Sequence, residues 1–195
     1  NVFNVAVGSN AGAAITTGTH NNFFGGLAGD ALTDGAANVA IGFAALSSDT
    51  RGHSSVAIGH GALGAQNFTS STDTYNTAVG KLAGTAVTTG TDNVFIGGLA
   101  GDGTDDGANN VAVGFQALSA NCQDGNTAVG RKTLVACTGN NNTALGDLAG
   151  FAITSGSNNL VLGKEAGRTG SPGGNFTAVS NVICLGDENI SACNI

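Results

Sequence analysis

Histidines and paired carboxylates are the side chains that most often carry hydrolytic chemistry, and this sequence holds few of either. Its three histidines are His20, His53 and His60, and its only glutamates are Glu165 and Glu188. The histidines fall at different positions of the sequence repeat described below, so stacked repeats would not gather them into a metal site or a nucleophile–base pair. A polysaccharide-cleaving solenoid would need carboxylates that converge in one groove, and we expect none. We therefore expect no enzyme activity, no catalytic residue, no cofactor and no metal site.

Asp-rich turns offer the oxygen ligands that Ca²⁺ prefers. One turn contains Asp30 and Asp34, and another contains Asp102, Asp105 and Asp106. The spacing of glycine and aspartate around them differs from the GGxGxDxUx nonapeptide of calcium-binding β-rolls. Ordinary turn aspartates are the better interpretation.

Four cysteines could form cross-links: Cys122, Cys137, Cys184 and Cys193. The first two occupy nearly equivalent positions of adjacent repeats, which would place their Cα atoms about 4.8 Å apart, within disulfide range. The sequence therefore predicts a Cys122–Cys137 disulfide and, with it, an oxidising extracellular setting. Cys184 and Cys193 could pair with each other or across chains.

The composition excludes several classes of protein. Only 10% of the residues are charged, and the formal net charge is −7 with six basic residues, which argues against binding to nucleic acid. Hydrophobic residues make up 41%, more than a disordered linker would hold. No apolar run approaches the roughly 18 residues of a membrane span, so we expect no membrane insertion. The chain begins and ends within patterned sequence and shows no signal peptide, so we expect a fragment of a longer protein.

A short motif recurs along the chain: asparagine, any residue, a small residue, an aliphatic residue and glycine. It first spans residues 4–8, and successive motif glycines are mostly 17 residues apart, with two longer units. Segments 25–30 and 97–102 are identical, and segment 37–46 is similar to 109–118. This similarity between segments four units apart indicates duplication of a four-unit block.

A 17-residue unit is too short for a helical hairpin, and its glycines would weaken a helix. Each unit has instead one short β-branched run, such as residues 77–79, and a second turn about ten residues after the motif glycine. The sequence therefore predicts an all-β fold, a parallel β-solenoid (β-roll) of about eleven 17-residue coils that forms one domain over residues 1–195.

Coils stacked about 4.8 Å apart would place equivalent residues above one another in columns. We expect the aliphatic motif position, as in Val79 and Ile96, to be the buried column. The asparagine position should form a ladder in which each side-chain amide bonds its copies above and below. The ladder residues are Asn4, Asn21, Asn38, Asn76, Asn93, Asn110, Asn126, Asn142 and Asn159. Ser55 takes the place of asparagine in one unit.

Two further columns are regular. One consists almost entirely of alanine, as in Ala83 and Ala100. It forms either a face that another chain approaches closely, which we favour, or the lining of a tight coil interior. The residue after the motif glycine alternates in charge over the last four units: Arg131, Asp147, Lys164 and Asp187. This alternation predicts exposed ion pairs between coils.

Two units carry insertions, at residues 64–75 and 168–180, and each contains Asn-Phe-Thr. Aromatic and amide side chains on loops suit sugar ligands, so the insertions are candidate binding loops. Alternatively, they are tolerated surface insertions whose phenylalanines cap the interior. The candidate residues are Asn67, Phe68, Thr69, Tyr75, Asn175, Phe176 and Thr177.

The motifs Asn76-Thr-Ala-Val-Gly80 and Asn126-Thr-Ala-Val-Gly130, with Leu82-Ala-Gly84 and Thr138-Gly-Asn-Asn-Asn142, resemble the repeats of tail-fibre-domain proteins and the heads of trimeric autotransporter adhesins. The resemblance covers nearly the whole chain. It implies a left-handed, homotrimeric β-roll in an elongated extracellular or virion fibre, and it leaves a phage tail fibre and a cell-surface adhesin as alternatives. The repeats of this chain diverge more from one another than those of that family's long arrays.

Together these features predict a non-enzymatic structural and adhesive fibre segment in an extracellular setting. It would associate with itself as a homotrimer or an end-to-end polymer, and its outside partner would be a cell-surface glycan or receptor. The alternative is a ligand- or ice-binding solenoid with a stacked Thr/Asn face. Ice binding requires parallel threonine columns; Thr17-Gly-Thr19 and Thr89-Gly-Thr91 fit, but the units between them break the array.

Overall fold

A computed structural model describes residues 3–168, 176–187 and 189 of the chain. The eleven strands of its main sheet are β1 (Val5–Val7), β2 (Asn22–Phe24), β3 (Val39–Ile41), β5 (Val56–Ile58), β7 (Thr77–Val79), β8 (Val94–Ile96), β9 (Val111–Val113), β10 (Thr127–Val129), β11 (Thr143–Leu145), β12 (Leu160–Leu162) and β13 (Ile183–Leu185). Two short strands, β4 (Gly52–His53) and β6 (Thr72–Asp73), form a second parallel pair. The described residues contain no helix that is long and apolar enough to span a bilayer.

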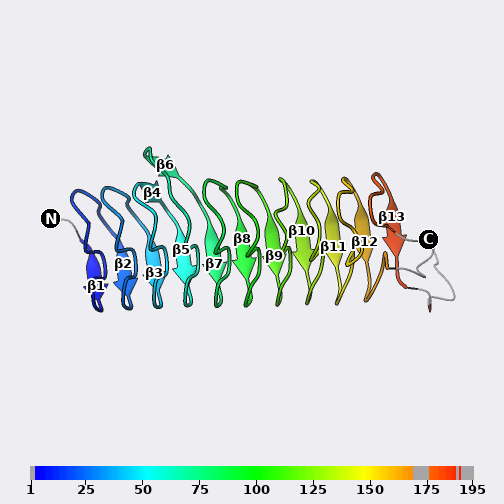
Figure 1. Cartoon of the computed structure of the whole chain (residues 1–195), viewed down its shortest axis with the longest axis horizontal. Coiled ribbons are helices and arrows are strands. Elements are labelled where there is room, and N and C mark those ends of the chain that lie inside the picture. Colours follow the sequence, from blue (N-terminus) through cyan, green and yellow to red (C-terminus); the bar gives the residue numbers. More distant parts are fainter. Residues whose placement is uncertain (1–2, 169–175, 188, 190–195) are drawn as a thin grey trace.

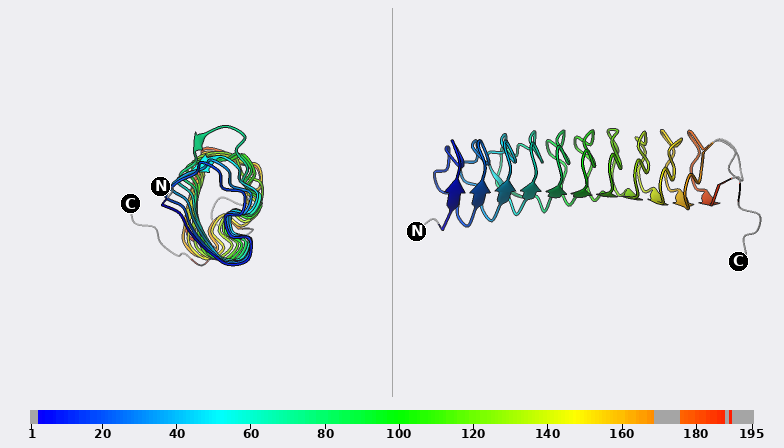
Figure 2. Two further views of the ribbon diagram at one scale, coloured as in Figure 1. Left: turned by 90° about the vertical axis from the view of Figure 1, so that its left-hand side faces the viewer. Right: turned by 90° about the horizontal axis from the view of Figure 1, so that it is seen from below.

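Every strand of the main sheet pairs in parallel with the strand of the next coil. Thr77 pairs with Val94 one 17-residue unit later, and the two longer units keep the same register, with Val56 opposite Thr77 and Leu160 opposite Ile183. The coils follow one another along a rod (Figure 1) and superimpose when the rod is seen end-on, except where the loop around β6 projects (Figure 2). The predicted all-β parallel solenoid is confirmed.

The interior is lined by the middle residue of each main-sheet strand from β2 to β13 and not by the aliphatic motif residue. Ala78 and Phe95 are fully buried, whereas Ile96 is 41% exposed and Val79 is half-buried. The prediction of a buried aliphatic column was therefore wrong. Successive side chains of a strand point to opposite faces, and the narrow coil leaves room inside only for a small residue at most middle positions.

The alanine column lies inside the coil. Its fully buried members are Ala28, Ala45, Ala62, Ala83, Ala100, Ala117, Ala149 and Ala166. The favoured expectation of an intermolecular alanine face was wrong, and the alternative of a tight interior is correct. Alanine is the side chain that fits because the opposite wall of the coil approaches closely.

Large and small side chains alternate between two facing interior positions: the middle strand residue and the fourth residue after the motif glycine. Phe95 faces Gly101, where an added Cβ would lie 2.5 Å from the Phe95 ring. The next coil has instead Ala112 and Leu118, both fully buried. Phe23 repeats the first arrangement in the earlier copy of the duplicated block. These coils thus combine one large and one small side chain, whereas the coil of Ala78 and Gly84 has two small ones, and side chains of the neighbouring coils pack against Gly84.

The motif glycine forms the corner that follows each strand. Gly80 has a φ of 143°, and an added Cβ there would lie 2.4 Å from the carbonyl oxygen of Gly97 in the next coil. Both the positive φ and the close approach of the neighbouring backbone require glycine at this position.

Candidate functional site

Each buried ladder asparagine joins its coil to the next through backbone groups. Asn93 is fully buried; its Nδ2 donates to the carbonyl oxygen of Gly107 at 2.9 Å, and its Oδ1 accepts the backbone N–H of Asn110 at 2.9 Å. The backbone N–H of Asn93 in turn donates to Asn76 Oδ1 at 3.0 Å. The side chains therefore satisfy backbone groups that the turns would otherwise leave unpaired inside the coil.

Bonds between ladder amides themselves occur in three consecutive pairs. Asn126 Nδ2 lies 3.2 Å from Asn110 Oδ1, Asn142 Nδ2 lies 3.2 Å from Asn126 Oδ1, and Asn159 Nδ2 lies 2.9 Å from Asn142 Oδ1. Asn110 Nδ2 is the ladder donor that lacks a partner in the described part of the chain. The unit that follows Asn110 is one residue short, with 16 residues between paired strand positions.

Gln66 supplies the amide that is missing where Ser55 interrupts the ladder. Its Nε2 donates to Ser55 Oγ at 2.9 Å and to Asp49 Oδ2 at 2.6 Å, and its Oε1 accepts from Asn76 Nδ2 at 2.9 Å. Ser55 Oγ also lies 2.5 Å from Thr74 Oγ1. All five side chains are fully buried. Gln66, which belongs to the insertion at 64–75, thus provides a buried amide inside the coil in the unit that lacks a ladder asparagine.

Asp49 anchors the first part of the same insertion. Its Oδ1 accepts backbone N–H groups from Gly52 at 3.0 Å, Phe68 at 3.1 Å and Arg51 at 3.3 Å. Sequence reasoning missed this cluster. The signal that could have revealed it is the loss of a ladder asparagine in the unit that also gains an insertion containing glutamine.

The candidate binding loops bury their phenylalanines. Phe68 is 6% exposed and Phe176 is 5% exposed, so neither ring is available to a ligand. The exposed candidates are Asn67, Thr69, Tyr75 and Thr177. Asn175 lies outside the described residues. This geometry agrees with the alternative in which the phenylalanines cap the interior.

The structure has Cys122, Cys137 and Cys184 as buried free thiols, and Cys193 lies outside the described residues. The predicted Cys122–Cys137 disulfide is not formed in it. Cys122 Sγ lies instead 3.1 Å from Thr104 Oγ1. Burial raises the pKa of Cys122 to about 11, so the thiol stays protonated at neutral pH.

The histidines take up separate contacts. His20 stacks on Phe3 and His60 stacks on Phe43, with ring centroids 5.3 and 5.6 Å apart. His53 Nδ1 accepts a backbone N–H from the preceding coil at 2.9 Å. No group of three or more histidine, cysteine, aspartate or glutamate side chains that could hold a metal ion occurs within the described residues.

Each Asp-rich turn has a partly buried aspartate, Asp30 in the first turn and Asp102 in the second. Asp30 Oδ1 and Asp102 Oδ1 are buried and have no hydrogen-bond partner among the described residues. Burial raises the pKa of Asp102, while a hydrogen bond with Ser119 acts in the opposite direction. Glu188 lies outside the described residues.

The alternating charge column forms one close ion pair. Arg131 Nε lies 2.8 Å from Asp147 Oδ1, and a second guanidinium nitrogen lies 3.0 Å from Asp147 Oδ2. Lys164 Nζ lies 3.9 Å from Glu165, a neighbour in its own coil. Both pairs are partly exposed, so each contributes at most about 1 kcal/mol.

A column of threonines links successive coils through side-chain hydroxyl groups. Thr16 Oγ1 donates to the carbonyl oxygen of Thr33 at 3.1 Å, Thr33 Oγ1 to that of Thr50 at 2.9 Å, and Thr154 Oγ1 to that of Thr177 at 2.8 Å. These hydroxyl donors are used in holding coils together, which leaves them unavailable to order water or a ligand.

The outward side of the main sheet is apolar, and we call it the outer face. It consists of the first and third residues of the eleven strands. Its strongly exposed hydrophobic members are Val5, Val7, Phe24, Ile41, Ile96, Leu145 and Ile183. None of the strand residues of the main sheet is charged. The motif residues expected in the interior thus form a flat apolar surface along the rod.

Comparison with models of protein families, with curated proteins and with solved structures gives no match to this chain.

Proposed function

We propose that this chain is a non-enzymatic structural and adhesive segment of an extracellular fibre, similar in plan to phage tail fibres and trimeric adhesin heads. In this proposal three copies associate through the outer face. The observation that carries it is the exposed, uncharged and regular apolar surface of the main sheet. A rod whose coils repeat one geometry also suits a fibre, because length grows by addition of units.

The size of the outer face supports an interface. Ten strand spacings of about 4.8 Å and three residues of about 3.3 Å give a surface of about 48 by 10 Å, or about 480 Å² per chain. Exposed apolar patches of more than a few hundred Å² mark interaction sites on soluble proteins. At about 25 cal/mol per Å² of apolar surface, covering this face contributes at most about 12 kcal/mol per chain before the entropy lost on association, because four of its positions are polar.

Identical copies can meet on this face without burying a charge. The chain carries a net charge of −7, and its acidic residues lie outside the main-sheet strands. The acidic groups that repel one another between copies therefore lie away from the surface that would be covered. Salt in solution screens this repulsion, because the groups stay exposed to solvent.

The experiment is a comparison of two lysine variants by light scattering. Ile96→Lys places a charge on the outer face, where Ile96 is 41% exposed. Ser48→Lys adds the same charge at an exposed turn position away from the sheet. We expect the unmodified chain and Ser48→Lys to be trimers, and Ile96→Lys to be a folded monomer. A trimer that survives Ile96→Lys would contradict the proposed interface.

The ligand- or ice-binding alternative has less support, because the units between Thr17-Gly-Thr19 and Thr89-Gly-Thr91 interrupt the threonine array that ice binding requires. A chain that stays monomeric in every variant and lowers the freezing point of water would favour that alternative.

A further inference from the structure

The buried cluster around Gln66 holds a carboxylate at an interior position that is aliphatic in other coils. Asp49 precedes a second-turn glycine by three residues, as Leu32 and Val87 do in their coils, and all three are fully buried. The donors to the Asp49 carboxylate are three backbone N–H groups and the Gln66 amide, none of which carries a charge. A carboxylate buried among neutral groups is costly, and such local conflicts are typical of functional sites. The cluster therefore points to a chemical role beyond packing.

We propose that the cluster joins Ser55 to Gln66 through an ester bond that forms after folding. Ser55 Oγ attacks Gln66 Cδ, the Cδ–Nε2 bond breaks, and the hydroxyl proton leaves with the nitrogen as ammonia. Atoms and electrons balance without an oxidant, a nucleotide or any other co-reactant. The reaction consumes side chains of the chain itself once, so it turns over no outside substrate. In the structure the amide is intact, which is the state before this step.

The Ser55 hydroxyl is held against the Gln66 amide with its oxygen lone pairs toward that amide. Thr74 Oγ1 donates its only hydrogen to the carbonyl oxygen of His53 at 2.8 Å, so the Ser55 hydroxyl, 2.5 Å away, donates to Thr74. Ser55 Oγ in turn accepts from Gln66 Nε2 at 2.9 Å. The Gln66 carbonyl carbon is one bond of about 1.33 Å from that nitrogen, hence within about 4.2 Å of the hydroxyl oxygen. A shift of about 1 Å brings the two atoms to the near-attack distance of about 3–3.5 Å.

Two further side chains stabilise the charges that develop during the step. Asn76 Nδ2 donates at 2.9 Å to Gln66 Oε1, the oxygen that gains negative charge when the carbonyl is attacked. Asp49 Oδ2 lies 2.6 Å from Gln66 Nε2, the nitrogen that gains positive charge when it takes up the hydroxyl proton. Fixed donors and charges in a buried site stabilise such a transition state strongly. The two groups thus face the reacting atoms whose developing charges they oppose.

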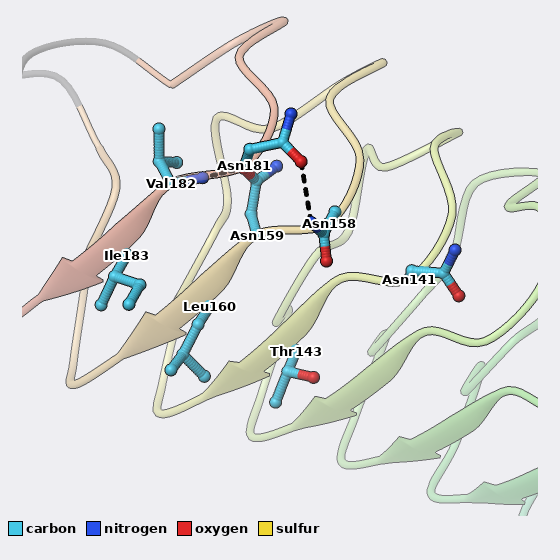
Figure 3. A pocket seen from close by; sticks show the side chains of 8 residues that line it. All are labelled: Asn141, Thr143, Asn158, Asn159, Leu160, Asn181, Val182 and Ile183. Carbon is cyan, nitrogen blue, oxygen red and sulfur yellow. Dashed lines mark hydrogen bonds between the residues drawn. The ribbon is translucent and has the colours of Figure 1, made fainter.

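The cluster lies inside the rod, so association through the outer face leaves it uncovered and unchanged. A groove beside β11, β12 and β13 differs in this respect (Figure 3). Thr143, Leu160 and Ile183 of its lining belong to the outer face, which a trimer would cover. The inferred ester therefore does not depend on the proposed fibre, and mass spectrometry tests it independently of the oligomeric state.

The test is mass spectrometry of the folded full chain, intact and after trypsin digestion. Cleavage after Arg51 and Lys81 releases residues 52–81 as one peptide that contains both partners. We expect this peptide to be about 17 Da lighter than its sequence mass, because ammonia is lost. Its fragment spectrum should lack ions from cleavage between residues 55 and 66, since the ester closes that segment into a ring. A peptide of unchanged mass, both fresh and after overnight incubation of the folded protein, would overturn the proposal.

Mild alkali distinguishes the ester from other losses of ammonia. Hydrolysis of the ester should convert the Gln66 side chain to a carboxylic acid, about 1 Da heavier than the original amide. A succinimide at an asparagine also loses ammonia, but its hydrolysis places the new acid at that asparagine and leaves the segment between residues 55 and 66 open to fragmentation. That second result would overturn the ester.

Three variants assign the roles within the cluster. Ser55→Ala removes the nucleophile and should abolish the mass loss, whereas Ser48→Ala, at an exposed serine, is the matched control and should retain it. Asp49→Asn keeps the shape of the side chain and removes its charge, so the cross-linked fraction should fall at least about tenfold. Circular dichroism shows that the variants compared are folded. A mass loss that persists in Ser55→Ala would overturn the proposed bond, and an unchanged fraction in Asp49→Asn would overturn the role of the carboxylate.

Discussion

Removal of one ladder amide in the middle of the rod should destabilise the protein strongly. In Asn93→Ala, the carbonyl oxygen of Gly107 loses the Nδ2 donor at 2.9 Å, and the N–H of Asn110 loses the Oδ1 acceptor at 2.9 Å. Asn93 is fully buried, so water cannot replace either bond without entering the coil. Each buried unpaired group costs about 1–3 kcal/mol, which gives a loss of about 2–6 kcal/mol in the free energy of unfolding.

The assay is urea unfolding followed by circular dichroism, with Asn109→Ala as control. Asn109 is the exposed neighbour of the ladder residue in the next coil, with a φ of 59°, and Ala37 shows that alanine is accepted there. We expect the control to change stability by less than about 1 kcal/mol. A loss below 1 kcal/mol for Asn93→Ala would refute the argument that the ladder holds coils together.

Three further predictions concern the interior. Phe95→Ala should lower the free energy of unfolding by about 3–5 kcal/mol, and Gly101→Leu should prevent native packing against the Phe95 ring. The double variant should recover at least half of the loss measured for Phe95→Ala, because it recreates the small–large pair of the next coil. Urea unfolding of the three variants tests this. Gln66→Glu should place a second buried carboxylate at the position 2.6 Å from Asp49 Oδ2. Two adjacent buried carboxylates disfavour the doubly charged state, so the stability of this variant relative to the unmodified chain should improve as the pH falls from 8 to 4 and the pair takes up a proton; thermal unfolding over that range that shows no such trend would contradict the cluster. Cys122, with a pKa raised by burial to about 11, should react with iodoacetamide at pH 8 only in urea, as peptide mass mapping can show.

The architecture could be predicted from the sequence because each sequence repeat corresponds to one coil of the solenoid. The nearly constant distance between motif glycines predicts which strands pair, and Gly80 and Gly97 face each other as a stacked corner requires. The insertions did not disturb this inference, since strands on both sides of them keep their register.

The direction of the side chains could not be inferred in the same way. A three-residue strand such as Val94–Ile96 offers no long alternation, and placing the large aliphatic residues inside was a natural choice. The structure reverses it, because the coil is narrow and Phe95 fits only where Gly101 makes room. The pairing of phenylalanine with a following glycine, repeated in the duplicated block, was the overlooked signal.

The buried cluster around Gln66 depends on contacts between coils that no single motif records. Gln66 reaches Asp49 and Ser55 only because the insertion returns to the same layer of the rod.

The most direct test of the central claim, that the outer face is covered by other copies of the chain, is sedimentation equilibrium of the unmodified protein over a range of concentrations. We predict a molar mass of three times 18.8 kDa. A mass of 18.8 kDa at every concentration would contradict the claim and leave the apolar face without its proposed partner.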